Sequence, residues 1–398
     1  MGPFKIAIIG AGPAGCNLVR LLYIASIPFT IFESDESPDA RGQGGTLDLR
    51  TDTGLFAIRA CGLYEEFLKY ARFDGESLLI GDKFLTKYVS VQAGSSVGGA
   101  RPEIDRAELR SLLRGSLPDD AIVWGYDLVV GADGGWSKTR RLVSDELPFY
   151  TGISGAEFSI LDIAKTHPDL CNLLNKGSVF IFSDNKALMA QQMGDGSLKV
   201  GEWGVREESW VLENPIDSPS AKIQLKRKIM AEYSSWALPL QTLLEAASPE
   251  TLVTRPLFML PIGYRWKHKR GVTLIGNAAR LMSPFAGEGA HLSMEDAVQL
   301  ASFISKSSSK EELYKNVHLY EDDMYRRARG SQERSFGNMK DMIILKVLEY
   351  SQQNSPIQTP IKHDVLKEEK EEKTPNATQC ASRFSGALMN QYQRVPEK

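Results

Sequence analysis

Near its start the chain alternates a short apolar run, a glycine-rich turn and a segment with apolar residues at helical spacing. Residues 5–9 (KIAII) run into Gly10, residues 13–25 carry the helical pattern, and residues 29–32 (FTIF) form a second apolar run that ends at Glu33. Strand, glycine turn, helix, strand and acid in this order make up one βαβ unit of a dinucleotide-binding fold. The pattern therefore predicts an α/β protein with a buried parallel sheet.

The turn itself has the sequence Gly10-Ala-Gly12-Pro-Ala14-Gly15, a GxGxxG motif between a strand and a helix. In such a motif Gly10 permits a tight turn, Gly12 lets the backbone approach a pyrophosphate, and Gly15 lets helix and strand pack closely. The helix N-terminus supplies N–H groups for the phosphates, and Glu33 can accept hydrogen bonds from ribose hydroxyls. A purely structural glycine turn is the alternative, but the βαβ context favours dinucleotide binding.

Two further glycine-containing motifs follow later in the chain. Residues 127–140 (DLVVGADGGWSKTR) lead from an apolar run into a turn around Asp133, and residues 276–291 (GNAARLMSPFAGEGAH) place Gly287 and Gly289 ahead of a helical pattern. Glycines at a helix N-terminus can present N–H groups to an anion. Taken separately, the first motif is equally explained by a β-turn before a serine-capped helix, and the second by an ordinary loop.

The remaining patterns predict the domain organisation. Helices are expected over residues 105–117, 221–233 and 290–304, apolar strands over 127–131 and 272–275, and an antiparallel sheet over 154–205, where β-rich runs alternate with Gly, Asn and Asp. A Rossmann-like domain (residues 1–75, 101–147 and 262–306) would then carry an inserted β-rich substrate domain (76–100 and 148–261). Helices over 307–351 would follow, and the proline- and charge-rich tail 352–398 is expected to be disordered.

Composition excludes several classes of protein. Lys and Arg total 47 against 50 Asp and Glu, a net charge of −3, which argues against a nucleic-acid binder. No apolar run reaches the roughly 18 residues that span a bilayer, so no membrane partner is expected. The four cysteines are far apart and lack metal spacing, which argues against a disulfide framework or a zinc site and favours a reducing, cytoplasmic location. They are Cys16, Cys61, Cys171 and Cys380.

Together the three motifs, in this order, resemble the class A flavoprotein monooxygenases of the para-hydroxybenzoate hydroxylase type, over about residues 4–350. The segments 41–49 (RGQGGTLDL) and 101–106 (RPEIDR) are similar to the branch that contains tetracycline-inactivating monooxygenases and fungal enzymes of secondary metabolism. The resemblance implies FAD as cofactor, NADH or NADPH as reductant, and O₂ and a small molecule as substrates. It does not indicate which small molecule, or the oligomeric state.

The resemblance also implies which residues hold FAD. Its ADP half would lie against the GxGxxG motif and Glu33, and the isoalloxazine near Arg41, which would stabilise the reduced ring. Asp133 belongs to a motif implicated in both FAD and nicotinamide binding. Ordinary surface charges remain the alternative for Arg41 and Arg106. The full implied cofactor set is Gly10, Gly12, Ala14, Gly15, Glu33, Arg41, Gly44, Gly45, Arg106, Asp133, Asn277, Pro284, Gly287 and Gly289.

Three positions depart from the family pattern: Asn277 stands for Asp, Arg280 for His, and His291 for Asn. Asn277 still offers a carbonyl acceptor, whereas Arg280 would add bulk and a permanent charge beside the cofactor. A lone histidine such as His291 is expected to be structural rather than a catalytic base. A further departure lies at residues 121–124 (AIVW), a strand pattern too close to the next strand for a crossover. The β-meander of the family is therefore missing at this point.

The resemblance implies an FAD-dependent monooxygenase that hydroxylates a small, electron-rich molecule, aromatic or polyketide-like, through a C4a-hydroperoxyflavin. Because the cofactor supplies the chemistry, no catalytic side-chain triad and no metal are expected. The alternative is a catalytically impaired flavin-binding remnant, or a partner-binding protein, because of the missing meander and the three substitutions. Another flavin reaction, such as epoxidation or halogenation, is a third possibility, although the halogenase WxWxIP pattern is absent.

Overall fold

The computed structural model of the protein describes residues 4–33, 45–73, 77–91, 102–116 and 126–341. Its first sheet contains four parallel strands in the order β13-β7-β1-β2. They are β1 (Ile6–Ile9), β2 (Phe29–Phe32), β7 (Leu128–Gly131) and β13 (Val272–Leu274). All four were predicted as apolar runs, and most of their residues are buried because helices cover the sheet, although Phe32 at the end of β2 is exposed. The expected α/β class is confirmed.

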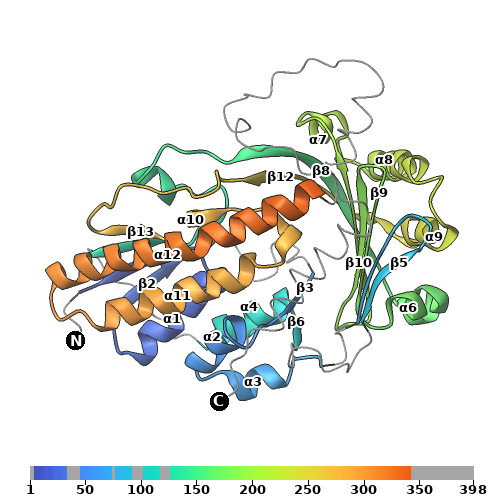
Figure 1. Cartoon of the computed structure of the whole chain (residues 1–398). Coiled ribbons are helices and arrows are strands. Elements are labelled where there is room, and N and C mark those ends of the chain that lie inside the picture. Colours follow the sequence, from blue (N-terminus) through green and yellow to red (C-terminus); the bar gives the residue numbers. More distant parts are fainter. Residues whose placement is uncertain (1–3, 34–44, 74–76, 92–101, 117–125, 342–398) are drawn as a thin grey trace.

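Three helices pack on this parallel sheet: α1 (Pro13–Ile24), α11 (Gly289–Ser305) and α12 (Lys310–Met339). Figure 1 shows them side by side in front of the sheet. Their apolar faces share one core with the strands, in which Ile6, Leu18 and Leu300 are fully buried. The long helix α12 begins at an N-cap serine, where the Ser309 hydroxyl accepts a hydrogen bond from the Glu312 N–H at 3.2 Å.

The second sheet has seven strands in the order β12-β8-β11-β10-β9-β4-β5. All neighbours are antiparallel except the β4–β9 pair, so this is the antiparallel layer that the sequence predicted. The strands are β4 (Leu78–Gly81), β5 (Lys87–Val91), β8 (Phe149–Ile160), β9 (Ser178–Ser183), β10 (Lys186–Gln192), β11 (Leu198–Val205) and β12 (Ser248–Met259).

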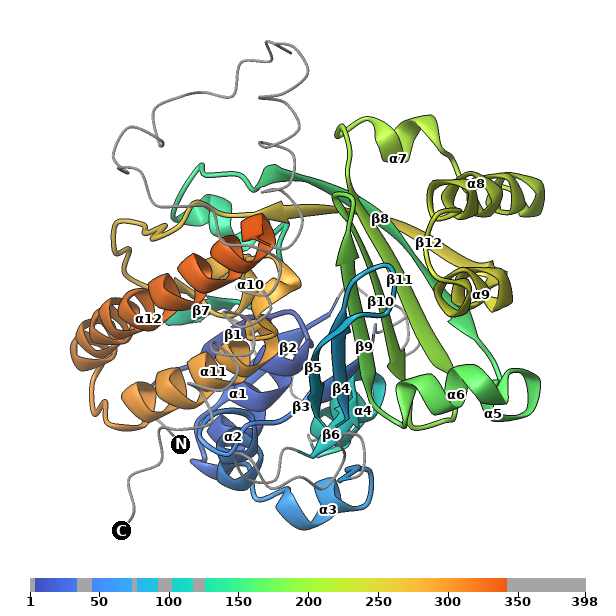
Figure 2. The ribbon, with the colours of Figure 1, turned by 45° about the vertical axis from the view of Figure 1, so that its right-hand side comes forward.

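Helices cover only one face of this large sheet. Figure 2 shows them on the side away from the parallel sheet, and their buried side chains form a separate core with the strands. The other face of the large sheet, which these helices do not cover, is directed toward the parallel sheet. The covering helices are α5 (Ile163–Thr166), α6 (Pro168–Leu174), α8 (Pro219–Glu232) and α9 (Leu238–Ala246), with the short α7 (Trp210–Glu213) at the top.

A small third layer lies below the other two (Figure 1). It contains the two-stranded antiparallel sheet of β3 (Thr46–Asp48) and β6 (Glu103–Asp105), with α2 (Gly54–Ala60), α3 (Tyr64–Leu68) and α4 (Arg106–Gly115). Only α4 was predicted; α2 and α3 are too short to give a clear helical period. The layer brings residues 45–50 and 103–106 next to each other.

The chain passes from α4 to β7 without room for a three-stranded meander, because only twelve residues, 116–127, separate them. Residues 121–124, which carry the unexplained strand pattern, and the tail 352–398 lie outside the described residues. The two large sheets draw on alternating stretches of sequence. The domain boundaries given above remain our proposal for how this chain is divided.

Candidate functional site

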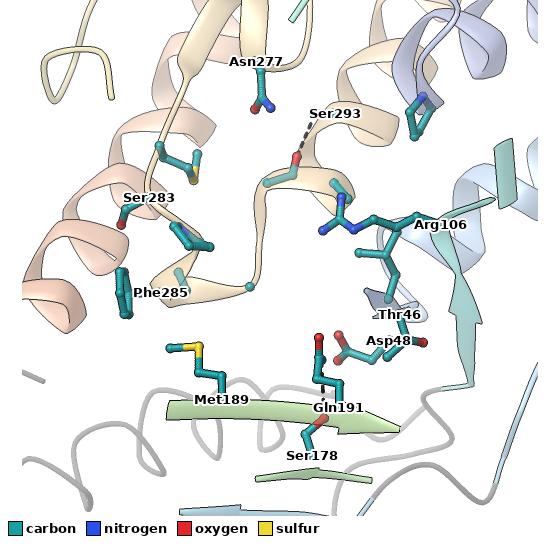
Figure 3. Close-up of a pocket in the computed structure, with 18 of the residues that line it drawn as sticks. Thr46, Asp48, Arg106, Ser178, Met189, Gln191, Asn277, Ser283, Phe285 and Ser293 are labelled. Atoms are coloured by element: carbon teal, nitrogen blue, oxygen red, sulfur yellow. Dashed lines mark hydrogen bonds between the residues drawn. The ribbon is translucent and has the colours of Figure 1, made fainter. Parts of the chain in front are cut away.

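A cavity of about 680 Å³ lies where the parallel sheet, the small layer and the free face of the large sheet meet. Figure 3 shows its walls. Of the implied cofactor residues, seven line it: Gly12, Ala14, Arg106, Asn277, Pro284, Gly287 and Gly289. Three segments that are distant in sequence, 12–14, 106 and 277–289, therefore contribute to one site.

The glycine-rich turn forms one wall. Gly12 has no heavy atom within 4 Å of the place where a Cβ would stand, so its backbone is open to the cavity. Gly10 and Gly15 instead serve packing: a Cβ at Gly15 would lie 1.9 Å from the Gly10 carbonyl oxygen, and one at Gly10 would lie 2.5 Å from the Ala132 oxygen. The φ of +110° at Gly10 also requires glycine. Neither of these two glycines lines the cavity.

Two helices point their N-termini at the cavity. Helix α1 follows Gly12 and helix α11 follows Glu288, and neither has a side chain that caps its first N–H groups. Pro13 and Ala14 at the start of α1, and Gly289 and Ala290 at the start of α11, line the cavity. Uncapped first-turn N–H groups and the positive end of the helix dipole bind anions and carbonyl oxygens. The cavity thus has two acceptor-binding ends.

Glu33 follows β2, as predicted, but does not line the cavity. One of its carboxylate oxygens accepts a hydrogen bond from the Ala11 N–H at 2.8 Å and lies 3.4 Å from the Arg110 guanidinium. The acid therefore holds the glycine-rich turn to helix α4. Its role toward a ribose stays a prediction.

Arg106 is the first residue of α4 and extends its guanidinium into the cavity (Figure 3). No described residue forms a hydrogen bond or a close ion pair with that guanidinium, although Glu157 lies near enough to interact with its charge. Burial lowers the pKa of Arg106, and the Glu157 carboxylate partly offsets this effect. A half-buried guanidinium with no hydrogen-bonded partner among the described residues is suited to bind a polar group of a ligand.

Asn277 begins the short helix α10 (Asn277–Arg280), and its amide faces the cavity (Figure 3). Arg140 fixes this turn from behind. Its buried guanidinium donates hydrogen bonds to the carbonyl oxygens of Ala278 at 2.8 Å, Gly135 at 2.7 Å and Asn277 at 3.2 Å. Arg140 thereby ties the second motif to the third, a positioning role that sequence reasoning did not assign.

Asp133 uses its carboxylate within its own loop. It accepts hydrogen bonds from the Ser137 hydroxyl, the Lys138 N–H and both the N–H and hydroxyl of Thr139, at 2.5–3.1 Å. These bonds organise the turn that leads into the 3₁₀ helix η1 (Thr139–Leu142). Its neighbours Ala132 and Gly134 line the cavity, whereas Asp133 does not.

The expectation that Arg280 places its charge beside the cofactor was wrong. Arg280 is 2% exposed, does not line the cavity, and pairs with the buried carboxylate of Asp296. His291 is also buried outside the cavity lining, with its Nε2 at 3.7 Å from Asp48 Oδ1. The structural role expected for His291 agrees with this burial.

The large sheet provides the opposite wall, which the sequence did not reveal. Phe180 on β9 pairs with Met189 on β10, and Ser178 pairs with Gln191, so that both cross-strand pairs present their side chains to the cavity (Figure 3). Alternation along β9 and β10 was the available signal, since residues two apart face the same side of a sheet. This wall is mainly apolar, and its polar groups include the Gln191 amide, the Ser178 hydroxyl and the paired side chains of Glu157 and Arg255.

The loop before β3 completes the implied set. Arg41 and Gly44 lie outside the described residues. Gly45 does not line the cavity; a Cβ there would lie 2.5 Å from the Gln191 side-chain oxygen, so glycine allows this loop to approach the large sheet. The following residues Thr46 and Asp48 do line the cavity.

These features fit a cofactor that carries a pyrophosphate. Gly12 leaves space at the start of α1, two uncapped helix ends supply N–H donors, and the Arg106 guanidinium has no hydrogen-bonded partner in the part of the chain that the structure describes. No helix among the described residues combines the length and apolar character needed to cross a lipid bilayer.

Comparisons with known proteins also indicate a chain that binds a cofactor with a pyrophosphate. The chain matches the FAD binding domain family over residues 124–332. It is 30% identical to the monooxygenase asqM of Emericella nidulans, with 84% of this chain and 95% of that protein covered, and 29% identical to the monooxygenase penA of Penicillium thymicola, with 84% and 94% covered. The alignment with asqM spans 423 positions, more than the 398 residues of this chain, so this chain lacks segments of its relative.

A solved structure shares the fold. Klebsiella pneumoniae HpxO, complexed with FAD and uric acid, superimposes with a TM-score of 0.70 at 18% identity, with 88% of this chain and 92% of that chain covered.

Proposed function

Since the chain belongs to the class A flavoprotein monooxygenases, whose cofactor is FAD, we propose that it uses NAD(P)H and O₂ to hydroxylate a small aromatic or polyketide-like molecule. One observation carries the proposal: two uncapped helix N-termini and an apolar sheet face enclose the same cavity. The polar ends suit the cofactor, and the sheet face suits a flat apolar substrate next to it.

In this proposal each wall has a separate task. FAD, when bound, supplies the redox chemistry and the activation of O₂. The start of α1 would hold the pyrophosphate of FAD. The Asn277 amide would form a hydrogen bond with a hydroxyl of the ribityl chain of FAD, either as donor or as acceptor. The N–H groups of Gly287 and Gly289 would hold the polar edge of the flavin and stabilise negative charge there. Arg106 would bind a polar oxygen of the cofactor.

The large sheet would orient the substrate. Phe180, Phe182 and Met189 give an apolar surface on which an aromatic ring can stack, and Gln191 offers an amide for one polar substituent. Phe285 closes the adjoining edge and is 5% exposed. Such walls exclude water from the reacting atoms, which favours transfer of oxygen to the substrate over wasteful release of peroxide.

Arg41 is proposed as the positive charge beside the flavin. A fixed guanidinium there would stabilise negative charge on the reduced ring. Arg41→Ala should slow flavin reduction in stopped flow by more than about tenfold, which corresponds to about 1.4 kcal/mol of transition-state stabilisation. An unchanged reduction rate at full FAD occupancy would exclude this role.

We also propose a reducing, cytoplasmic location. The three cysteines in the described part of the chain are free thiols, and burial raises the pKa of both Cys16 and Cys61 to about 12. Such thiols are poorly reactive.

The test of the proposed function has two steps. Denaturing the purified protein should release intact FAD into the filtrate, and the FAD-loaded protein should oxidise NADH or NADPH faster when a suitable phenol or polyketide is present, with one hydroxylated product per turnover. A protein that stays colourless with excess FAD would instead be a remnant or a partner-binding protein. Tight FAD binding with no substrate-stimulated NAD(P)H oxidation would identify an impaired flavoprotein.

A further inference from the structure

His268, His318 and Glu321 come together outside the cavity. His268 lies between β12 and β13, and the other two residues are one turn apart on α12. One ligand atom from each residue lies within 4.8 Å of the other two. Glu321 Oε2 is 2.7 Å from His268 Nδ1 and 3.9 Å from His318 Nδ1. None of the three residues lines the cavity described above.

The Glu321 carboxylate is held in a fixed orientation. Its side chain is 1% exposed, and its Oε1 accepts hydrogen bonds from Trp266 Nε1 at 3.1 Å and from the Thr273 hydroxyl at 2.9 Å. Both of these donors are themselves buried. Because Oε1 is engaged, Oε2 is directed at the two imidazoles. Hydrogen bonds of this kind commonly orient the carboxylate ligands of metal ions.

The two basic residues that follow His268 in sequence have partners elsewhere. Lys269 donates a hydrogen bond to the Leu142 carbonyl oxygen at 2.9 Å, and Arg270 pairs with Glu311 at 2.6 Å. Neither cation is therefore engaged with Glu321. The imidazole rings of His268 and His318 lie with their centroids 4.6 Å apart, and a nitrogen of each ring faces one oxygen of the Glu321 carboxylate.

We propose that His268, His318 and Glu321 form a binding site for Zn²⁺. Two imidazoles and one carboxylate are a ligand set that zinc accepts, with water in the fourth position. Tetrahedral zinc with bonds of about 2.0–2.1 Å sets its ligand atoms about 3.3 Å apart. The 2.7 Å and 3.9 Å separations lie on either side of that value. The His318 side chain is 53% exposed, so it can adjust and leave space for the water.

The site has a structural consequence. Thr273 belongs to β13, and the same strand leads directly into Gly276 and Asn277 of the cavity wall. Zinc would join α12 to the loop before that strand, and so stabilise the folded chain without contact with the cofactor. No metal was expected from the sequence, in which His268 and His318 stand fifty positions apart without a motif that connects them.

Zinc binding can be measured without any enzyme assay. We expect the full chain, freed of affinity tag and treated with chelator, to bind one Zn²⁺ per chain in equilibrium dialysis, and to show no binding of Mg²⁺, which prefers oxygen ligands. The thermal midpoint should rise with ZnCl₂ and not with MgCl₂. Zinc-edge anomalous scattering from crystals should place the ion between the three side chains.

Two variants distinguish a zinc site from a direct contact between His268 and Glu321 that involves no metal. His318→Ala removes a half-exposed ligand and keeps the His268–Glu321 contact, so it should fold normally and bind zinc at least tenfold more weakly. His268→Ala should have the same effect, whereas the matched change His167→Ala, at a described histidine outside the cluster, should leave zinc affinity unchanged. Unchanged zinc affinity in both His268→Ala and His318→Ala, or no zinc binding by the parent chain, would overturn the proposal and leave only a direct His268–Glu321 contact.

Discussion

The Arg280 guanidinium is paired with the Asp296 carboxylate outside the cavity lining, and both side chains are almost fully buried. Asp296 also accepts a hydrogen bond from the Gly276 N–H at 3.0 Å and pairs with Arg327 at 3.2 Å. Asp296 on α11 is thus the anchor for the turn that presents Asn277. Arg280 takes part in the support of the site and does not enter it.

Loss of Arg280 should therefore destabilise the fold. Arg280→Met leaves Asp296 with the Gly276 N–H and the Arg327 guanidinium as partners. We expect the free energy of unfolding to fall by about 3 kcal/mol, because removing one member of a buried ion pair leaves the charge of the other less well compensated. Urea denaturation at neutral pH measures the change. The matched control is Arg270→Met, which breaks an exposed pair with Glu311 (66% and 71% exposed) and should cost less than about 1 kcal/mol. Equal losses in the two variants would contradict the supporting role of Arg280.

Restoring the family aspartate at position 277 should not tighten FAD binding. An ionised acceptor gains about 1 kcal/mol over a neutral amide in one hydrogen bond. Repulsion from the pyrophosphate and the cost of desolvating the carboxylate oppose that gain. Arg280 cannot offset them, because Asp296 already holds it. Titration of apoprotein with FAD should give Asn277→Asp an affinity equal to or weaker than that of the parent. Fivefold or greater tightening would show that Asn277 is a defect in this chain.

Arg106 should have opposite effects on cofactor affinity and on stability. Arg106→Met removes a charged donor from the cavity, and FAD affinity should fall roughly tenfold to a hundredfold, equivalent to about 1.5–3 kcal/mol. The apoprotein should be as stable as the parent or more so, because the guanidinium is desolvated without a hydrogen-bonded partner among the described residues.

The control for Arg106 lies on the same helix. Arg114 is exposed in the last turn of α4, so Arg114→Met should change neither FAD affinity nor apoprotein stability. A loss of stability in Arg106→Met as large as its loss of FAD binding would show that Arg106 is structural.

Local patterns predicted the dinucleotide-binding half of the fold well. Residues 6–9, 13–24, 29–32 and 128–131 form the expected elements, because a buried parallel strand is a continuous apolar run and α1 starts at a proline after a glycine turn. The motifs also identified the cavity: Gly12, Arg106, Asn277 and Gly289 all line it.

Long-range contacts were not predictable in the same way. That Phe180 and Met189 face the cavity depends on the register of β9 and β10 and on which face of the sheet the helices cover. The direction of Arg280 depends on Asp296, sixteen residues away on another helix. Neither the facing of Phe180 and Met189 nor the pairing of Arg280 with Asp296 can be predicted from neighbouring residues in the sequence, because tertiary packing determines which side chains meet.

Glu288 should make stability depend on pH. It precedes α11 at the cavity and pairs with Arg334 at 2.8 Å and Arg50 at 3.3 Å. Burial alone would raise its pKa, but bonds and charges from Arg334, Ser331 and Arg50 outweigh burial and hold the pKa below its ordinary value. The folded-state pKa is lowered, so the stabilisation is present above the unfolded-state value of about 4.3 and is lost as pH falls through the folded-state value.

Glu288→Gln should therefore lower the free energy of unfolding by about 2 kcal/mol at pH 7, and the difference in unfolding free energy between variant and parent should narrow below about pH 4.3. Urea denaturation across this range, with the 71% exposed Glu311→Gln as control, tests it. A gap that stays constant with pH would show that the loss comes from packing and not from the charge of Glu288.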